Sequence, residues 1–260
     1  VLFLEGTVLK KKKIISDLIL NIGATAAPII VLQLVILPAL ADDMSDDRYG
    51  LLVTILSLLN VIPATLGNVL NNIRLLYNDS YKESKCEGDF NIILLFMAAM
   101  NIIIVGIASF YYDHSITWAD LLLTILVSVF WLAKEYFIVS FLIEINYAAI
   151  LLNNLLQVVG YIAGYLIYCF TGYWQIIYIM GYIVSLIYIF KRSSLWREKL
   201  KITALFKNTI SQGTLLMAAS VLARITTYAD KMLIYPIVGG AMVSVYYPAT
   251  VSGKIVSMAI

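Results

Sequence analysis

Eight long apolar runs, joined by short polar segments, occupy most of this 260-residue chain. Hydrophobic residues make up 62% of it and charged residues 13%, which is more apolar surface than a water-soluble domain can bury. A membrane-crossing helix needs about 20 apolar residues, whereas a barrel strand needs about 10 and shows an alternating pattern that is absent here. We therefore predict an all-α polytopic membrane protein. The predicted spans are 14–40, 49–73, 91–112, 117–143, 148–171, 174–190, 209–237 and 243–260.

Cationic residues outside these runs fall in alternate connections. Thirteen lie in one set of connections, and only Arg48 lies in the other set, beside Asp42, Asp43, Asp46 and Asp47. Connections rich in Lys and Arg stay on the cytoplasmic side of a membrane. This asymmetry predicts a cytoplasmic amino terminus. The thirteen are Lys10, Lys11, Lys12, Lys13, Arg74, Lys82, Lys85, Lys191, Arg192, Arg197, Lys199, Lys201 and Lys207.

The basic segment 191–207 separates six runs from the last two. It mixes cations with leucine, tryptophan and phenylalanine, which is typical of a helix lying in the membrane interface. The simpler interpretation, a topology signal in a linker, also explains it. Pro38 precedes Tyr49 much as Pro236 precedes Tyr246, which suggests two lobes of similar plan. We expect a two-lobe transporter that is a fragment of a longer protein. Its parts are a complete six-helix lobe (1–190), the linker (191–207), and the first two helices of a truncated second lobe (208–260).

The seventh run carries the densest set of polar groups. Ionisable side chains at membrane depth are costly and are therefore functional candidates. Spacings of three and four place two cations and several hydroxyls on one helical face, and Asp230 is expected to point about 100° away from Lys231. The face consists of Ser220, Arg224, Thr227, Tyr228 and Lys231.

Three other runs also have a polar face. These are Asp17, Asn21 and Thr25 in the first run, Asn60, Ala64, Gly67, Asn71 and Arg74 in the second, and Tyr247, Thr250 and Lys254 in the eighth. Amides, hydroxyls and cations suit a wet cavity for an anionic, hydroxyl-rich solute, because Arg and Lys bind phosphate. The alternative is that these groups satisfy one another, that Arg74 and Asp17 are interfacial, and that Lys231 reaches outward along the helix.

Other polar positions have structural explanations. We expect Lys134 and Glu135 to mark where the fourth helix leaves the hydrocarbon. The fifth run aligns Asn153, Gln157, Gly160 and Gly164, which predicts close packing with a neighbouring helix. Most of six tyrosines are expected to form an aromatic belt near the outer surface, with a minority free to stack against sugar rings. They are Tyr161, Tyr165, Tyr168, Tyr173, Tyr178 and Tyr182.

No catalytic or nucleotide-binding motif appears in the chain, so an enzyme is not predicted, and neither is a cofactor or a metal site. The net charge of +2 is the sum of two opposed faces and gives no reason to expect nucleic acid as a partner.

Two stretches resemble the bacterial polysaccharide transporters that flip lipid-linked oligosaccharides. One runs from Asp46-Asp47-Arg48-Tyr49-Gly50-Leu51-Leu52 to the helix end Leu66-Gly67-Asn68-Val69-Leu70-Asn71-Asn72-Ile73-Arg74. The other is Tyr228-Ala229-Asp230-Lys231-Met232-Leu233-Ile234 with Gly239-Gly240 and Val245-Tyr246-Tyr247-Pro248-Ala249. Members often have a cation near the end of the first helix, where this chain has Pro38-Ala39-Leu40.

The resemblance implies two six-helix lobes around a central cavity, lined by helices one, two, seven and eight, that opens to each side in turn. It implies a bacterial cytoplasmic membrane and an undecaprenyl-pyrophosphate-linked repeat unit for capsule, O-antigen or exopolysaccharide as cargo. Membrane lipid is a second partner, and a polysaccharide polymerase complex is a candidate partner.

The expected roles combine the polar faces with this resemblance. Pyrophosphate candidates are Arg224, Lys254, Lys231 and Arg74, and glycan candidates are Asn60, Asn71, Thr227, Tyr228 and Tyr247. The alternative function is a cation-coupled drug or metabolite antiporter of related architecture. Its ion-coupling carboxylate would be Asp17, Glu135 or Asp230.

Overall fold

The computed structural model describes residues 23, 26–84 and 88–259, with side chains described as far as residue 250. Helices make up 87% of the structure, and the described residues contain no strand, which confirms the all-α prediction. In chain order the elements are the π-helix η1 (Leu32–Ile36), α2 (Leu37–Asp43), α3 (Asp46–Val61), α4 (Pro63–Glu83), α5 (Asp89–Tyr112), α6 (Trp118–Phe137), α7 (Val139–Ile143), α8 (Tyr147–Thr171), α9 (Gln175–Arg192), the 3₁₀ turn η2 (Leu195–Arg197), α10 (Phe206–Val238) and α11 (Gly240–Ala259).

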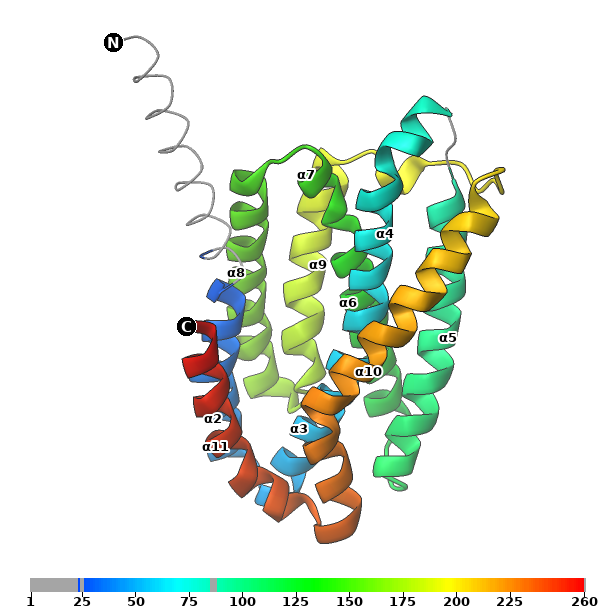
Figure 1. Ribbon diagram of the computed structural model, residues 1–260. Coiled ribbons are helices and arrows are strands. Elements are labelled where there is room, and N and C mark those ends of the chain that lie inside the picture. Colours follow the sequence, from blue (N-terminus) through cyan, green and yellow to red (C-terminus); the bar gives the residue numbers. More distant parts are fainter. Residues whose placement is uncertain (1–22, 24–25, 85–87, 260) are drawn as a thin grey trace.

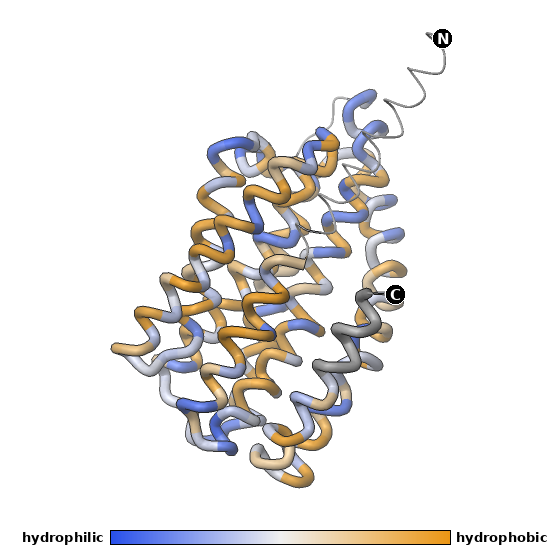
Figure 2. Tube along the Cα trace, turned by 90° about the vertical axis from the view of Figure 1, so that its left-hand side faces the viewer, coloured by the Kyte–Doolittle hydropathy of each residue, from blue (hydrophilic) through white to orange (hydrophobic). Residues whose placement is uncertain are grey.

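Six helical segments of the described chain are long and apolar enough to cross a bilayer. They match the first six predicted spans and indicate a membrane protein. They are Ala26–Asp43, Asp46–Glu83, Asp89–Tyr112, Trp118–Ile143, Tyr147–Thr171 and Gln175–Arg192. In Figure 2 hydrophobic positions dominate the middle of the bundle and hydrophilic ones gather toward its two ends.

The last two predicted spans are also helices, α10 and α11, but they are not among these six segments. Helix α10 runs diagonally across α4 and continues to α3, and α11 then returns beside α3 (Figure 1). The two helices therefore pack directly on the second predicted span. Their assignment to a separate lobe stays a prediction.

The basic connections meet at one end of the bundle. The carboxyl ends of α4 and α9, the amino end of α10 and the linker all lie at the top of Figure 1, and the acidic connection between α2 and α3 lies at the opposite end. This arrangement matches the alternation read from the charges. We call the two ends the basic end and the acidic end. The prediction that the basic end is cytoplasmic remains a prediction.

The prediction of an interfacial helix over 191–207 is wrong. Between α9 and α10 the chain forms a single 3₁₀ turn and is otherwise irregular. Some backbone N–H and C=O groups of this segment, which would bond to one another in a helix, instead form hydrogen bonds with side chains of the helix bundle. Asn91 donates to the carbonyls of Leu195 and Glu198, and the Asp89 carboxylate accepts the N–H of Thr203.

Glycines bring α8 and α9 together, as the spacing of Gly160 and Gly164 predicts. A Cβ on Gly160 would lie 2.6 Å from the Met180 carbonyl oxygen, and one on Gly164 would lie 2.6 Å from the Ile177 Cα. The Asn153 side chain accepts a hydrogen bond from the Ser185 hydroxyl at 3.0 Å across the same interface. Small residues and a buried polar pair are typical of helix contacts in membranes.

The expected aromatic belt is wrong for four of its six tyrosines. Tyr161, Tyr168, Tyr178 and Tyr182 are all buried. The rings of Tyr161, Tyr178 and Tyr182 form a cluster with Trp131 of α6, with ring centroids 5.5–6.3 Å apart. Packing between α6, α8 and α9, and not the membrane surface, sets their position.

Candidate functional site

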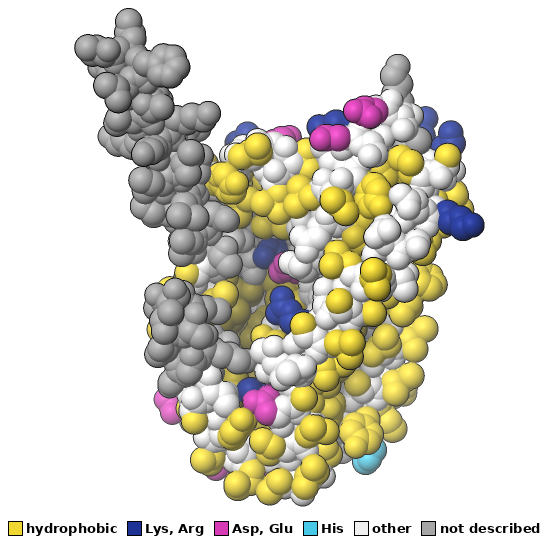
Figure 3. Space-filling view, viewed as in Figure 1, with side chains coloured by type: hydrophobic (Ala, Val, Ile, Leu, Met, Phe, Trp, Pro, Cys, Tyr) yellow, Lys and Arg dark blue, Asp and Glu magenta, His cyan; other side chains and the backbone are white. Residues whose placement is uncertain are grey.

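A hollow opens on the face of the molecule bordered by α10 and α11, and basic and acidic side chains lie inside it (Figure 3). Polar groups from four elements also contact one another in pairs where α10 and α11 pack on the first two spans. We call this set the central cluster; it consists of Gln33 in η1, Asn60 in α3, Arg224 and Tyr228 in α10, and Tyr247 in α11. Each element arrives from a different predicted span.

Asn60 and Tyr228 join α3 to α10. The Tyr228 hydroxyl donates to the Asn60 side-chain oxygen at 3.3 Å, and the Asn60 amide donates to the carbonyl of Leu56 at 2.9 Å. Arg224 lies one turn before Tyr228 and is within electrostatic range of its hydroxyl. Asn60, Arg224 and Tyr228 are all partly exposed, so the contact is open on one side.

Tyr247 joins α11 to the first span. Its hydroxyl donates to the Gln33 side-chain oxygen at 2.6 Å, and its ring meets the Tyr49 ring edge-on at 6.3 Å between centroids. Gln33 lies in a π-helix, a local widening of the helix that is frequent at functional sites. Gln33 was not among the predicted site residues. The signal was present, because Gln33 lies two intervals of four residues beyond Thr25 in the series Asp17, Asn21, Thr25.

Lys231 lies beneath the outer surface of α10 and is 1% exposed. Its ammonium contacts the Asp230 carboxylate at 3.0 Å and lies 5.7 Å from the Tyr246 ring and 5.9 Å from the Tyr247 ring. Successive Cα–Cβ directions in a helix differ by about 100°, as expected for Asp230 and Lys231, but the long lysine side chain bends back and forms the ion pair.

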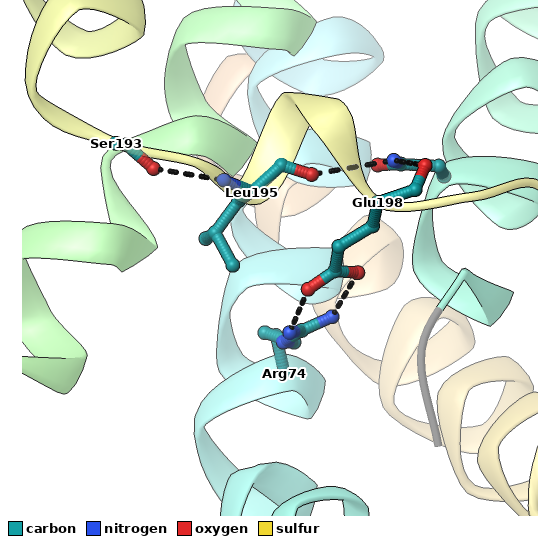
Figure 4. Close-up of polar contacts among 5 residues, drawn as sticks. Arg74, Ser193, Leu195 and Glu198 are labelled. Atoms are coloured by element: carbon teal, nitrogen blue, oxygen red, sulfur yellow. Dashed lines mark hydrogen bonds and ion pairs between the residues drawn. The ribbon is translucent and has the colours of Figure 1, made fainter. Parts of the chain in front are cut away.

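Arg74 is held by the linker. Its guanidinium makes two hydrogen bonds to the Glu198 carboxylate (Figure 4). Its cationic carbon lies 4.7 Å from the Phe90 ring centre. Both charged side chains are about 90% buried. The structure places this pyrophosphate candidate at the basic end, away from the central cluster, with its strongest donors already engaged.

Neighbouring polar groups extend this contact into a network that we call the linker lock: Arg74, Tyr81, Asp89, Asn91, Glu198, Thr203 and Thr209. Asp89 is fully buried and accepts hydrogen bonds from the Tyr81 and Thr203 hydroxyls and from the Thr203 N–H. The Tyr81 hydroxyl also contacts the Thr209 hydroxyl at 2.9 Å. The network ties the linker and the start of α10 to α4 and α5.

Two glycan candidates lie outside the central cluster. Asn71 is 4% exposed and donates to the backbone carbonyl of Glu135 at 3.0 Å, where it supports the contact between α4 and α6. A Cβ on nearby Gly67 would lie 2.6 Å from the Leu132 carbonyl oxygen, so this face of α4 is a packing face. Thr227 is exposed, and its hydroxyl donates back to the carbonyl of Ala223 at 3.0 Å.

Two of the three ion-coupling candidates have a lysine neighbour. Glu135 contacts Lys134 at 3.3 Å, and Asp230 contacts Lys231 at 3.0 Å. Lys134 is buried, and the span continues beyond it through α7. Asp17 and the side chain of Lys254 lie outside the described residues.

Comparison of the chain with protein-family models, with curated proteins and with solved structures found no match. The resemblance to polysaccharide transporters therefore rests on the residues quoted above, and the family stays a prediction.

Proposed function

We propose that the chain is part of a transporter that moves an anionic, lipid-linked oligosaccharide across the membrane. The expected cargo is an undecaprenyl-pyrophosphate-linked repeat unit, and two six-helix lobes would move it by alternating access. The observation that carries the proposal is the central cluster. Two side-chain hydrogen bonds, Tyr228 to Asn60 and Tyr247 to Gln33, connect α10 and α11 to the first spans beside a cation at span depth.

The chemistry of the cluster suits such a cargo. Arg224 offers a guanidinium, which binds phosphate oxygens through paired N–H groups. Amides and phenolic hydroxyls both donate and accept, as sugar hydroxyls do. Since each neutral hydrogen bond contributes only about 0.5–1.5 kcal/mol net, the contacts between helices can be exchanged for contacts to a glycan at small cost.

For the described residues, the proposed roles follow from exposure and existing partners: the pyrophosphate is assigned to Arg224, and the glycan to Asn60, Tyr228 and Tyr247. Lys254 is proposed as a second pyrophosphate contact from the sequence pattern alone. Lys231 is buried and paired with Asp230, so we assign it a supporting positive charge and no direct contact with the cargo. Arg74 is paired with Glu198 in the linker lock. Its guanidinium could contact cargo only after the Arg74–Glu198 ion pair breaks.

The test is delivery of lipid-linked oligosaccharide to the outer leaflet in cells that make the full-length protein. Arg224→Ala combined with Lys254→Ala should abolish delivery at unchanged protein level, because both cations that face the diphosphate are removed. Lys207→Ala is the matched control, since it removes an exposed cation at the basic end. Normal export by the double variant would refute the assignment.

A second measurement separates the proposal from the antiporter alternative. Efflux of cationic dyes should be absent from cells that make the protein, because no cationic cargo is expected. Dye efflux that disappears in Asp230→Asn would favour the antiporter and overturn the proposal.

A further inference from the structure

A polar pocket of about 330 Å³ lies at the basic end, apart from the central cluster and the linker lock. The carboxyl ends of α7 and α9 and the start of the linker form it. Its polar lining includes Ser140, Glu144, Lys191, Arg192, Ser193 and Arg197.

The pocket has a surplus of positive charge. Lys191, Arg192 and Arg197 line it together with a single carboxylate, Glu144. In the part of the chain that the structure describes, the ion pairs involve other cations, namely Arg74, Lys134 and Lys231. The three pocket cations are exposed and line the same pocket, so an anion that bound here would lower the repulsion among them.

Hydroxyl groups complete the donor set. The Ser193 oxygen accepts the N–H of Leu195 at 3.2 Å, which orients the side chain and leaves its own proton to donate elsewhere (Figure 4). Ser140 and Ser194 also line the pocket. Guanidinium and ammonium groups with nearby hydroxyls are the donors that a phosphate group prefers.

Exposed apolar side chains follow the pocket cations along the linker and favour a position at the level of lipid headgroups. Trp196 is 43% exposed, Leu200 61% and Ile202 63%, all on the same linker as the cations. The Trp196 indole donates to the carbonyl of Phe190 at 3.2 Å, and the Arg197 guanidinium lies 4.8 Å from the Trp196 ring centre. Tryptophan with flanking cations is typical of the membrane–water interface.

We propose that this pocket binds the phosphate of an anionic glycerophospholipid. Arg192, Arg197 and Lys191 contact the phosphate oxygens, and Ser193 donates a hydrogen bond. One acyl chain runs down the lipid-facing side of α9, where Ile187 is 50% exposed. Exposed apolar groups on both sides of the cations favour a lipid over a soluble phosphate. The inference depends on the membrane location of the helices and not on the cargo proposed above.

The test uses the purified full-length protein and native mass spectrometry with phosphatidylglycerol and phosphatidylcholine. The wild type should retain phosphatidylglycerol preferentially. Arg192→Gln with Arg197→Gln should weaken that retention about ten- to thirtyfold, because each cation near the headgroup contributes on the order of 1 kcal/mol. Lys201→Gln with Lys207→Gln changes the charge equally outside the pocket and should leave retention within about twofold of the wild type.

Three results would overturn the proposal. Equal loss in both double variants would mean general attraction to the basic end. Displacement of phosphatidylglycerol by millimolar inorganic phosphate would mean a soluble phosphate ligand. A photoactivatable phosphatidylglycerol, which needs no variant, should form adducts within residues 187–197 of the wild type, and adducts spread evenly over the basic end would contradict the site.

Discussion

The linker lock and the central cluster are both polar, but they differ in how deeply their groups are buried. In the lock, Arg74 and Glu198 pair inside the protein, and Asp89 accepts three hydrogen bonds while fully buried. In the cluster, the hydrogen bond between Asn60 and Tyr228 joins two side chains that are both partly exposed. A buried network holds helices together, whereas partly exposed groups can exchange their protein partners for a ligand.

The largest expected effect on stability comes from breaking the buried Arg74–Glu198 ion pair. Glu198→Ala should lower the free energy of unfolding by about 3–5 kcal/mol, because it leaves the buried guanidinium of Arg74 without a counter-charge. Thermal or denaturant unfolding in detergent micelles measures it. Glu83→Ala, an exposed carboxylate at the same end, should change stability by less than about 0.5 kcal/mol.

A double variant sharpens the result. Arg74→Met with Glu198→Leu removes both charges and should recover most of the loss, since apolar replacement of a buried pair is often neutral. A double variant as unstable as Glu198→Ala would mean that the linker and not the charge pair is the source of the effect.

The second prediction tests the close fit of the linker. Gly88 has φ of +105°, and a Cβ there would lie 1.7 Å from the Lys199 carbonyl oxygen. Gly88→Ala should therefore cost about 2–4 kcal/mol, from backbone strain and displacement of the linker together. Gly172 also has a positive φ, +73°, but no atom within 4 Å of its Cβ position. Gly172→Ala should show the strain alone, about 1 kcal/mol, and equal costs at both sites would refute the close contact.

The third prediction concerns the charge pair beside the cluster. Lys231→Met should cost about 1–3 kcal/mol, less than Glu198→Ala, because the side chain of Asp230 is 31% exposed and can be solvated when its partner is lost. The two variants are compared in the same unfolding assay. A larger decrease in the free energy of unfolding than for Glu198→Ala would show that Asp230 is not solvated when Lys231 is removed.

The smallest effect is expected within the cluster. Tyr247→Phe removes the hydroxyl that donates to Gln33 and should cost about 0.5–1.5 kcal/mol of stability. The same variant should slow oligosaccharide delivery more than it lowers protein level, because the hydroxyl is a proposed glycan contact. Tyr77→Phe removes a hydroxyl that accepts from Asn208 at the basic end and should leave delivery unchanged. Equal delivery by both variants would remove Tyr247 from the proposed site.

Run length allowed the helices to be predicted, because apolar length is a local property of the sequence. The breaks inside two runs were missed: α3 ends just before Pro63, whose ring prevents a continuous helix, and a kink at Ile138 separates α6 from α7. Pro63 was a readable signal. The kink at Ile138 has no comparable residue beside it.

The linker lock could not be predicted from spacing. Arg74 and Glu198 are 124 residues apart, and no sequence pattern pairs the two. Periodicity gives the face of one helix but not the helix that the face will meet. For the same reason it placed Asn71 with the glycan candidates, although that side chain binds the backbone of α6, and it assigned Tyr178 to a belt, although packing buries it.

Helix α10 is attached at both of its ends and has its polar groups between them. Near its start, Thr209 contacts Tyr81; near its finish, Tyr112 donates to the carbonyl of Met232, and the following Gly240 packs on Gly50. A rod fixed at two points cannot swing as a rigid body. While both attachments persist, the segment around Arg224 can move away from α3 only if the helix itself bends.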